Sequence, residues 1–346
     1  MKLLIYAPDI HKFDAVGEHC ISLFKLFKSN GVNVSIFSKN SSYDCGDIEV
    51  LHSDNMKSHC SDESVIIFAY SIYDSFLDEI IRFDGKKICY FHNITDPLVV
   101  KDLDPKTKDL CKKGFEQLGR LTDVDYIVCN SKFTLSLVKK FNKHVSVSPP
   151  LGPDFLSELD SVEIRPVNDK VKLVYIGRVS PHKNLECLLD ILVTLKVNYK
   201  MNASLEIYGD TINQEYFEKI INLAYEKGII NDVAFFGKVR RQFITDAIDC
   251  SDFIVTSSLH EGFCLPMLEA MYAHRIPLTI SGTAAEEVVG DERLVFSGAE
   301  RAADIIYTLS HNNDLRTSII LELKERAKRI ISNTSSQFWD SILERI

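Results

Sequence analysis

The sequence predicts an α/β protein with two doubly wound parallel-sheet domains. Short apolar runs rich in β-branched and aromatic residues alternate with segments of helical period, as expected of parallel strands that helices cover on both faces. The runs form two series, and 346 residues suit about two domains of roughly 150 residues each. The expected strands of the first series are residues 3–7, 34–38, 64–70, 87–92 and 126–130, and those of the second are residues 172–177, 204–208, 233–237, 253–257, 276–281 and 293–296. Each series is typical of a Rossmann-like domain.

A proline-rich segment separates the two series. Residues 146–153 contain three prolines and one glycine, which continue neither pattern, so we place a hinge there. The predicted domains are therefore 1–148 and 149–325, and we expect them to face each other across a cleft. The remaining residues, 326–346, form a helical segment that we expect to pack back toward the first domain, with Trp339 as a packing anchor.

Charge is unevenly distributed along the chain. Most of the net charge of −9 lies after residue 150, whereas residues 97–144 are rich in lysine. This basic stretch is either a solvated helix surface or a peripheral contact with the inner face of a membrane. The acidic total charge and the lack of a basic stripe with interleaved aromatic residues argue against nucleic-acid binding.

The composition favours a cytoplasmic protein. The nine cysteines are odd in number, include no CxxC pair and often lie in apolar runs, so we expect them to be reduced core residues. No stretch approaches the roughly 20 apolar residues that a membrane-spanning helix requires. The apolar residues 1–7 are too few for a signal peptide.

Two glutamates flank a strand-to-helix turn in the second series. The strand 253–257 leads into a loop that holds Glu261, and Pro266 suits the first turn of a helix, where a missing N–H costs nothing. The unpaired amides of residues 265–268 would point out of this helix and attract an anion. Glu261 on the loop and Glu269 in the first helical turn could accept hydrogen bonds from hydroxyl groups. A sugar nucleotide, which has both phosphates and hydroxyls, meets these needs.

A second turn in the same series supplies positive charge. Gly177 ends the strand 172–177 and Arg178 follows it directly. Lys183 lies where the next helix begins. Arginine offers a planar fork and lysine a point charge, which together suit a diphosphate. Each such contact contributes about 1.5–3 kcal/mol, against about 0.3–1 kcal/mol for a free helix N-terminus. The two cations should therefore dominate phosphate affinity.

Several motifs between about residues 175 and 295 together resemble one known family. In chain order they are IGRVSPHKN, LEIYGD, VAFFGKV, SSLHEGFCLPMLEAM and GTAAEEVVGDERLVF. They resemble the donor domain of a retaining GT-B glycosyltransferase of family 4, also called glycosyl transferases group 1. The resemblance implies a hexosyltransferase of polysaccharide biosynthesis, which moves a sugar from a UDP- or GDP-sugar to a glycan or lipid-linked glycan. We expect no metal or other cofactor, because the cations and helix amides neutralise the phosphates.

The resemblance also implies roles for particular residues. Arg178 and Lys183 would grip the diphosphate, Glu269 would hold the ribose, and Glu261 would meet the transferred sugar. His92, at the end of the strand 87–92, would face the sugar and the acceptor. The expected catalytic residues are thus His92, Arg178, Lys183 and Glu261, and the further donor contacts are Gly17, Gly177, Gly237, Lys238, Val239, Gly262, Phe263, Cys264, Leu265 and Glu269.

Two positions depart from the family pattern. Cys264 stands where relatives often carry glycine or serine, which predicts a tuned rather than an abolished site. In the first loop Gly17 alone remains where many relatives have two adjacent glycines, and only this residue would let the backbone approach a phosphate. Acceptor or donor geometry should differ accordingly.

Three other interpretations concern metal and function. Paired aspartates, Asp102 with Asp104 and Asp123 with Asp125, could hold a divalent ion. The first pair lies in a lysine-rich loop and the second precedes its strand, so we expect neither to bind metal. A GT-B nucleotide-sugar epimerase, which needs no acceptor, and a non-catalytic donor- or glycan-binding subunit remain alternatives to a transferase.

Overall fold

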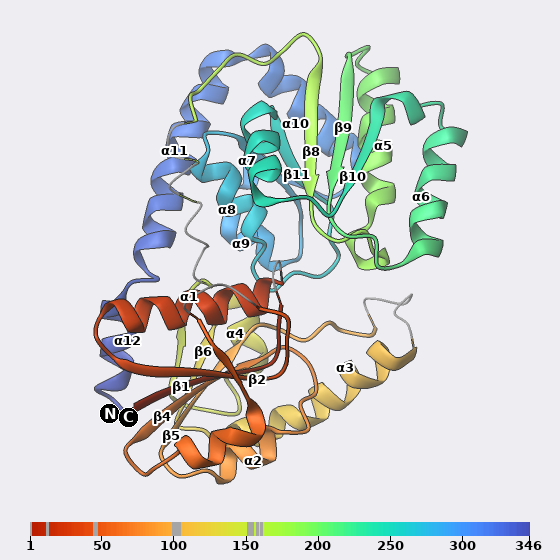
Figure 1. The fold of residues 1–346 in the computed structure, drawn as a ribbon. Helices are drawn as coiled ribbons and strands as arrows, with labels where there is room; N and C mark the ends of the chain where they lie inside the picture. Colours follow the sequence, from red (N-terminus) through yellow and green to blue (C-terminus); the bar gives the residue numbers. More distant parts are fainter. Residues whose placement is uncertain are drawn as a thin grey trace. The chain divides into compact units, whose positions relative to one another are not determined.

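The computed structural model describes residues 2–11, 14–43, 48–98, 105–150, 156, 159 and 162–346. These residues divide into two compact units (Figure 1). The first unit takes the described residues of Met1–Pro97, Leu103–Pro153 and Ile330–Ile346, and the second takes those of Leu98–Asp102 and Asp154–Arg329. Each unit contains its own parallel sheet.

The sheet of the first unit has seven strands in the described residues, in the order β3-β2-β1-β4-β5-β6-β7, and every pair is parallel. The strands are β1 (Lys2–Ile10), β2 (Asn33–Ser41), β3 (Val50–His52), β4 (Ser64–Tyr70), β5 (Lys86–Phe91), β6 (Tyr126–Cys129) and β7 (Val145–Val147). The helices are α1 (Ala15–Ser29), α2 (Leu77–Arg82), α3 (Pro105–Gln117), α4 (Lys132–Val138) and α12 (Ser336–Leu343), with the 3-10 helices η1 (Ser53–His59) and η2 (Leu118–Asp123).

Both faces of this sheet are buried, as β1 illustrates. Successive side chains of a strand point to opposite faces. Leu3 and Ile5 join an apolar cluster with residues of α1 and α12, whereas Leu4 and Tyr6 join a second cluster with residues of α2 and α3. Figure 1 shows α1 on one side of the sheet and α2 on the other. Two covered faces explain why the strands are almost continuously apolar.

The sheet of the second unit has six strands in the described residues, in the order β10-β9-β8-β11-β12-β13, again all parallel. The strands are β8 (Val171–Ile176), β9 (Ala203–Tyr208), β10 (Val233–Gly237), β11 (Phe253–Thr256), β12 (Ile276–Ile280) and β13 (Val295–Phe296). The helices are α5 (Leu185–Val197), α6 (Gln214–Glu226), α7 (Arg241–Cys250), α8 (Leu265–Tyr272), α9 (Ala284–Val289), α10 (Ala299–His311) and α11 (Asn313–Ser332), with η4 (Pro181–Lys183), η5 (Ile230–Asp232) and η6 (Glu292–Leu294).

The order of the strands in this second sheet creates a switch point. The chain moves from β8 to β9 and β10 on one side, then returns to place β11, β12 and β13 on the other side. Loops that leave β8 and β11 in opposite directions open a crevice at their carboxyl ends, where ligands of such sheets bind. The fold therefore marks the loops after β8 and β11 as the place to look for a site.

The prediction of two doubly wound parallel-sheet domains is confirmed, but the hinge was placed partly inside a strand. Residues 146 and 147 belong to β7, which pairs with β6, and the amide of Ser148 donates to the carbonyl of Cys129 at 3.0 Å. This strand was missed because it has only three half-buried residues beside the prolines. Residues 151–153 of the proposed hinge lie outside the described residues.

The end of the chain packs on the first unit through its only tryptophan. Trp339 of α12 is 1% exposed, and its ring lies edge to face with Phe27 at 5.9 Å and stacked with Tyr90 at 6.3 Å between centroids. The expectation that Trp339 is a packing anchor is therefore confirmed. Because Tyr90 lies on β5, α12 reaches the centre of the first sheet.

Cysteines in the described residues form no disulfide, and Cys45 lies outside those residues. Four of them are buried, as expected of core residues, whereas Cys250 is exposed: the buried ones are Cys20, Cys89, Cys111 and Cys129. None of the helices described combines the length and the apolar character that crossing a bilayer would need.

Replacing Trp339 with alanine should destabilise the first unit. Removing a large buried ring costs about 3–5 kcal/mol through lost transfer free energy and the cavity left behind. Urea unfolding followed by circular dichroism measures the loss. Leu321→Ala is the matched control, because Leu321 is 51% exposed and its truncation should change stability by less than about 0.5 kcal/mol. Equal effects of the two substitutions would contradict the anchoring role.

Candidate functional site

Hydrogen bonds join the loops that follow β8 and β11 in the second unit. The amide of Leu259 donates to the carbonyl of His182 at 2.8 Å, and the hydroxyl of Ser257 donates to the carbonyl of Asn184 at 2.7 Å. The side-chain amide of Asn184 donates back to the carbonyl of Ser257 at 3.3 Å. The two loops that contain the predicted phosphate and sugar ligands are thus held together by the backbone and by short polar side chains.

An ion pair between Lys183 and Glu261 also joins these loops. Nζ of Lys183 lies 2.6 Å from Oε1 of Glu261, and each side chain is 14% exposed. A lysine ammonium has three donors, so Lys183 can hold Glu261 and still donate to a phosphate. Arg178 is exposed at the start of the first loop. The structure therefore brings together two of the predicted catalytic residues by direct contact and places the third, Arg178, on the same loop as Lys183.

Three glycines lie at the carboxyl ends of neighbouring strands. Gly177 follows β8, Gly209 follows β9 and Gly237 is the last residue of β10. The amide of Gly177 donates to the carbonyl of Tyr208 at 2.8 Å, and the amide of Gly209 donates to the carbonyl of Gly237 at 2.9 Å. A Cβ at Gly209 would lie 1.9 Å from the carbonyl oxygen of Gly177, and a Cβ at Gly177 would lie 2.5 Å from the Tyr175 hydroxyl. Backbone therefore forms this part of the sheet edge, where a bulky ligand group would otherwise meet side chains.

The residues predicted to border the nucleobase follow in the same place. Gly237 ends β10 with a φ of 65°, Lys238 is exposed and Val239 is half-buried. All three lie at the carboxyl edge of the sheet that also carries Gly177. Their contact with a base remains a prediction.

Helix α8 begins where it was expected, although one glutamate lies further along it. Leu265 is the first helical residue and Pro266 lies in the first turn, as predicted. Glu269 is the fifth helical residue, so its assignment to the first turn was wrong: the helix begins at Leu265 and a turn holds about 3.6 residues. The remaining residues of the loop before α8 are buried or half-buried: Gly262 and Cys264 are half-buried and Phe263 is buried.

Cys264 has a strained backbone at the N-terminus of α8. Its φ of 81° and ψ of 75° lie in the left-handed region, which costs a non-glycine residue about 1–3 kcal/mol. This strain explains why a glycine would suit the position. Burial raises the pKa of the Cys264 thiol well above its usual range, with Glu261 adding to the effect, so this cysteine is not poised as a nucleophile.

Glu269 contacts a cation that the sequence analysis missed. Its side chain is 5% exposed, and its Oε1 lies 3.1 Å from Nη2 of Arg241, the first residue of α7. Its Oε2 has no hydrogen-bond partner among the residues the structure describes. A signal for Arg241 was present in the sequence, since a cation in the first turn of a helix opposes the helix dipole and so indicates a role other than helix stability.

The predicted residues of the first unit are His92 and Gly17. His92 directly follows β5, and its backbone is fixed by donation to the Tyr70 carbonyl at 2.9 Å and by acceptance from the Asn130 side chain at 3.1 Å. Gly17 lies in the first turn of α1, where a Cβ would lie 2.9 Å from the backbone nitrogen of His11. Close packing within the first unit thus accounts for the glycine, and a phosphate contact there remains a prediction.

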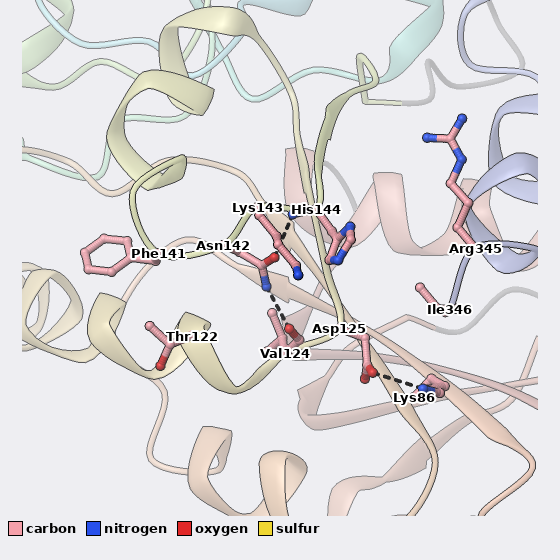
Figure 2. Close-up of a pocket in the computed structure, with 10 residues that line it drawn as sticks. All are labelled: Lys86, Thr122, Val124, Asp125, Phe141, Asn142, Lys143, His144, Arg345 and Ile346. Carbon is pink, nitrogen blue, oxygen red and sulfur yellow. Dashed lines mark hydrogen bonds and ion pairs between the residues drawn. The ribbon is translucent and has the colours of Figure 1, made fainter.

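A pocket of about 440 Å³ opens at the opposite edge of the first sheet (Figure 2). Its lining includes Lys86 and Asp125 at the amino ends of β5 and β6, together with Arg345 near the end of the chain. Asp125 accepts a hydrogen bond from the Lys87 amide at 2.8 Å and pairs with Lys86 at 3.3 Å. Because His92 lies at the carboxyl end of β5, this pocket does not belong to its site.

Asp123 and Asp125 each contact a basic side chain in the described part of the chain. Asp125 has the partners named above, and Asp123 pairs with Arg120 at 2.8 Å. Asp102 and Asp104 lie outside the described residues. No group of three or more histidine, cysteine, aspartate or glutamate residues in the described ranges could hold a metal ion.

Residues 157–328, just under half of the chain, match the protein family described as Glycosyl transferases group 1. The chain contains a glycosyl transferases group 1 domain. This group 1 domain includes both loops joined by Lys183 and Glu261, as well as Arg241 and Glu269.

A curated relative of the group 1 domain is the serotype-specific mannosyltransferase WbdA of Escherichia coli. It is 24% identical over 227 residues, which cover 61% of this chain and 27% of WbdA. The chain therefore spans only about a quarter of the length of this relative.

Solved structures share the whole fold at low sequence identity. The structure of Anabaena Alr3699/HepE in complex with UDP-glucose has a TM-score of 0.72 at 14% identity and covers 100% of both chains. Sucrose-phosphate synthase from Thermosynechococcus elongatus has a TM-score of 0.74 at 13% identity, again over 100% of both chains. These likenesses establish the fold that surrounds the group 1 domain.

His182 should make stability depend on pH. Burial, with help from the nearby Lys183, lowers the pKa of His182 from 6.5 to about 3. Below about pH 6.5, His182 is protonated in the unfolded chain but stays neutral in the folded chain. The free energy of unfolding therefore falls by up to about 1.4 kcal/mol for each unit by which the pH is lowered. Above that pH the two states bind the same number of protons at this residue, and its contribution is constant.

Urea unfolding of wild type and His182→Asn at about pH 7 and about pH 5 measures this difference. Asparagine keeps a polar atom near the Ser180 hydroxyl, which lies 3.3 Å from Nδ1 of His182. We expect wild type to lose more stability than the variant as the pH falls. Parallel losses in the two proteins would contradict the assignment.

Proposed function

We propose that the chain is a retaining glycosyltransferase of family 4 that moves a hexose-type sugar from a UDP- or GDP-sugar to a glycan or lipid-linked glycan acceptor. The group 1 domain supports the reaction class, and the site at the switch point supports the donor class. WbdA is described as a mannosyltransferase, and the HepE structure contains UDP-glucose, which agrees with a nucleotide-sugar donor. Polysaccharide biosynthesis is the process that fits such an acceptor.

The donor diphosphate would lie between the loops after β8 and β11. Arg178 is exposed and Lys183 is bound on one side only by Glu261, so both have donors for phosphate oxygens. The amides at the start of α8 would meet the phosphates from the other side. Charge that develops on the leaving diphosphate would be stabilised more in the transition state than in the ground state.

The ribose of the donor would bind Glu269, and the buried Oε2 of this side chain is the observation that carries the proposal. Arg241 occupies Oε1, while Oε2 is buried without a hydrogen-bond partner among the described residues. A buried carboxylate oxygen left without a donor is unfavourable. A ribose hydroxyl at Oε2 would remove that cost, and the base would then lie beside Gly237, Lys238 and Val239.

Transfer would follow a front-face route. The bond between the anomeric carbon and the diphosphate oxygen breaks, and an acceptor hydroxyl oxygen forms its bond to that carbon on the same face. The acceptor proton passes to the leaving phosphate oxygen, so no protein base is needed. Glu261 and His92 would orient the sugar, with His92 in its neutral form because burial lowers its pKa to about 3.

We further propose that the donor binds without a metal ion, since two cations and the amides of α8 meet the phosphate charge. The acceptor would bind mainly to domain 1–148, the donor to domain 149–325, and the segment 326–346 would complete the first domain. The lysine-rich stretch 97–144 would make a peripheral contact at the inner face of a membrane, where anionic lipid attracts it.

The double variant Arg178→Ala/Lys183→Ala should lose affinity for the nucleoside diphosphate. Two charge-assisted contacts of about 1.5–3 kcal/mol each correspond to a loss of roughly 100-fold or more. Calorimetric titration with UDP and with GDP measures the change.

Lys170→Ala is the control, because Lys170 precedes β8 at the opposite edge of the same sheet and pairs with Asp232 at 3.3 Å. Thermal unfolding of all the variants shows whether loss of the ion pair between Lys183 and Glu261 disturbs the fold. Unchanged affinity in a folded double variant would remove the diphosphate assignment.

A further inference from the structure

His19 of α1 contacts His92 directly within the first unit. Nδ1 of His19 lies 3.2 Å from Nε2 of His92, and the two rings meet edge to face with centroids 5.0 Å apart. His19 is 1% exposed. His19 is not among the site residues predicted from the sequence.

The ring of Tyr90 packs against both imidazoles. The ring of Tyr90 lies 4.1 Å from that of His19 and 4.6 Å from that of His92, between centroids. The Tyr90 hydroxyl in turn donates to the carbonyl of Ser148 at 2.7 Å. With the backbone of His92 fixed by Tyr70 and Asn130, the two imidazoles have little freedom to rotate.

The hydrogen bond between the two histidines requires one donor and one acceptor. Burial lowers the pKa of His92 to about 3 and lowers the pKa of His19 as well, so near neutral pH each ring carries a single N–H. Two arrangements remain. Either His19 donates from Nδ1 to His92, or His92 donates from Nε2 to His19.

The other nitrogen of His19 distinguishes these arrangements. Its Nε2 is buried and has no hydrogen-bond partner among the described residues. If His92 were the donor, the proton of His19 would lie on this Nε2 and would have no acceptor. Orphaned buried N–H groups are rarer than bare acceptors. The unpartnered Nε2 therefore favours the arrangement in which Nδ1 of His19 carries the proton and donates it to Nε2 of His92.

We propose that His19 is a positioning residue that holds His92 as the Nδ1–H tautomer. Nε2 of His92 then serves as the acceptor, and its Nδ1–H remains to donate to a hydroxyl of the substrate. The tautomer is a property of the free protein, whereas its effect on turnover rests on the proposed function. His19 itself need not touch the substrate.

Nitrogen-15 NMR of histidine-labelled protein tests the tautomer without any substrate. In the wild type we expect the chemical shifts of His92 to show a protonated Nδ1 and an unprotonated Nε2. In His19→Phe we expect the opposite pattern or a mixture of the two tautomers. Phenylalanine keeps the ring packing and removes the hydrogen bond. A wild-type His92 that carries its proton on Nε2 would overturn the proposal.

Turnover of a UDP- or GDP-sugar tests the consequence. We expect kcat to fall about 10- to 100-fold in His19→Phe with little change in KM for the donor, because the misplaced group acts in the reaction rather than in binding. His19→Asn should recover part of kcat, since its amide can donate from nearly the same place as Nδ1.

His144→Phe is the matched control, because His144 is exposed at the amino end of β7. A folded His19→Phe variant with wild-type kcat would overturn the positioning role. A wild type that turns over no sugar nucleotide would instead overturn the proposed function, and the NMR pattern would still decide the tautomer. Should His19→Phe fail to fold, the wild-type spectrum and His19→Asn decide the question.

Discussion

The hydrogen bonds between the loops after β8 and β11 are the constraint on which the candidate donor site depends. Both strands are central in the second sheet, so pairing with a neighbour on each side fixes their positions independently of the loop contacts. The carbonyl of His182 and the hydroxyl of Ser257 then hold the loops to each other. Ser257 is fully buried, so loss of its bonds would also leave a buried polar group unpaired. Lys183 and Glu261 can meet because these bonds place them opposite each other.

Two ion pairs in the second unit leave different hydrogen-bonding groups available to a ligand. Lys183 pairs with Glu261 but keeps donors for a phosphate, whereas Arg241 satisfies one oxygen of Glu269 and leaves the other oxygen for a hydroxyl. Buried ion pairs contribute little to stability once desolvation is counted. Their arrangement is better explained by a ligand that carries both phosphates and hydroxyls. In the first unit the pair of His19 and His92 follows the same logic, with one atom engaged and one left to donate.

Regular elements and their order were predictable from the sequence because parallel strands covered on both faces leave an apolar signature. Helix α8 was predictable because Pro266 suits a first turn. Short β7 escaped prediction, since three half-buried residues beside prolines carry little signal. The position of Glu269 was misjudged by one residue, since α8 begins at Leu265 and its first turn is complete before residue 269.

Two contacts in the candidate sites join residues that are far apart in the sequence, so the sequence did not predict them. Arg241 lies 28 positions before Glu269 in the chain, and His19 lies 73 positions before His92. Neither pairing follows from local period or spacing. Only the folded units bring α7 beside α8, and α1 beside the residue that follows β5. By contrast, the sequence alone predicted that neighbours in a motif, such as Gly177 and Arg178, lie together at a strand end.

Calorimetric titration of the wild type with UDP and with GDP, both in excess EDTA, tests the central claim most directly. The account predicts saturable binding of at least one of the two without any divalent ion, because Arg178, Lys183 and the start of α8 would supply the positive charge. Binding that appears only when manganese or magnesium is added would contradict the metal-free site. Absence of binding by both nucleotides under all of these conditions would contradict the donor site itself.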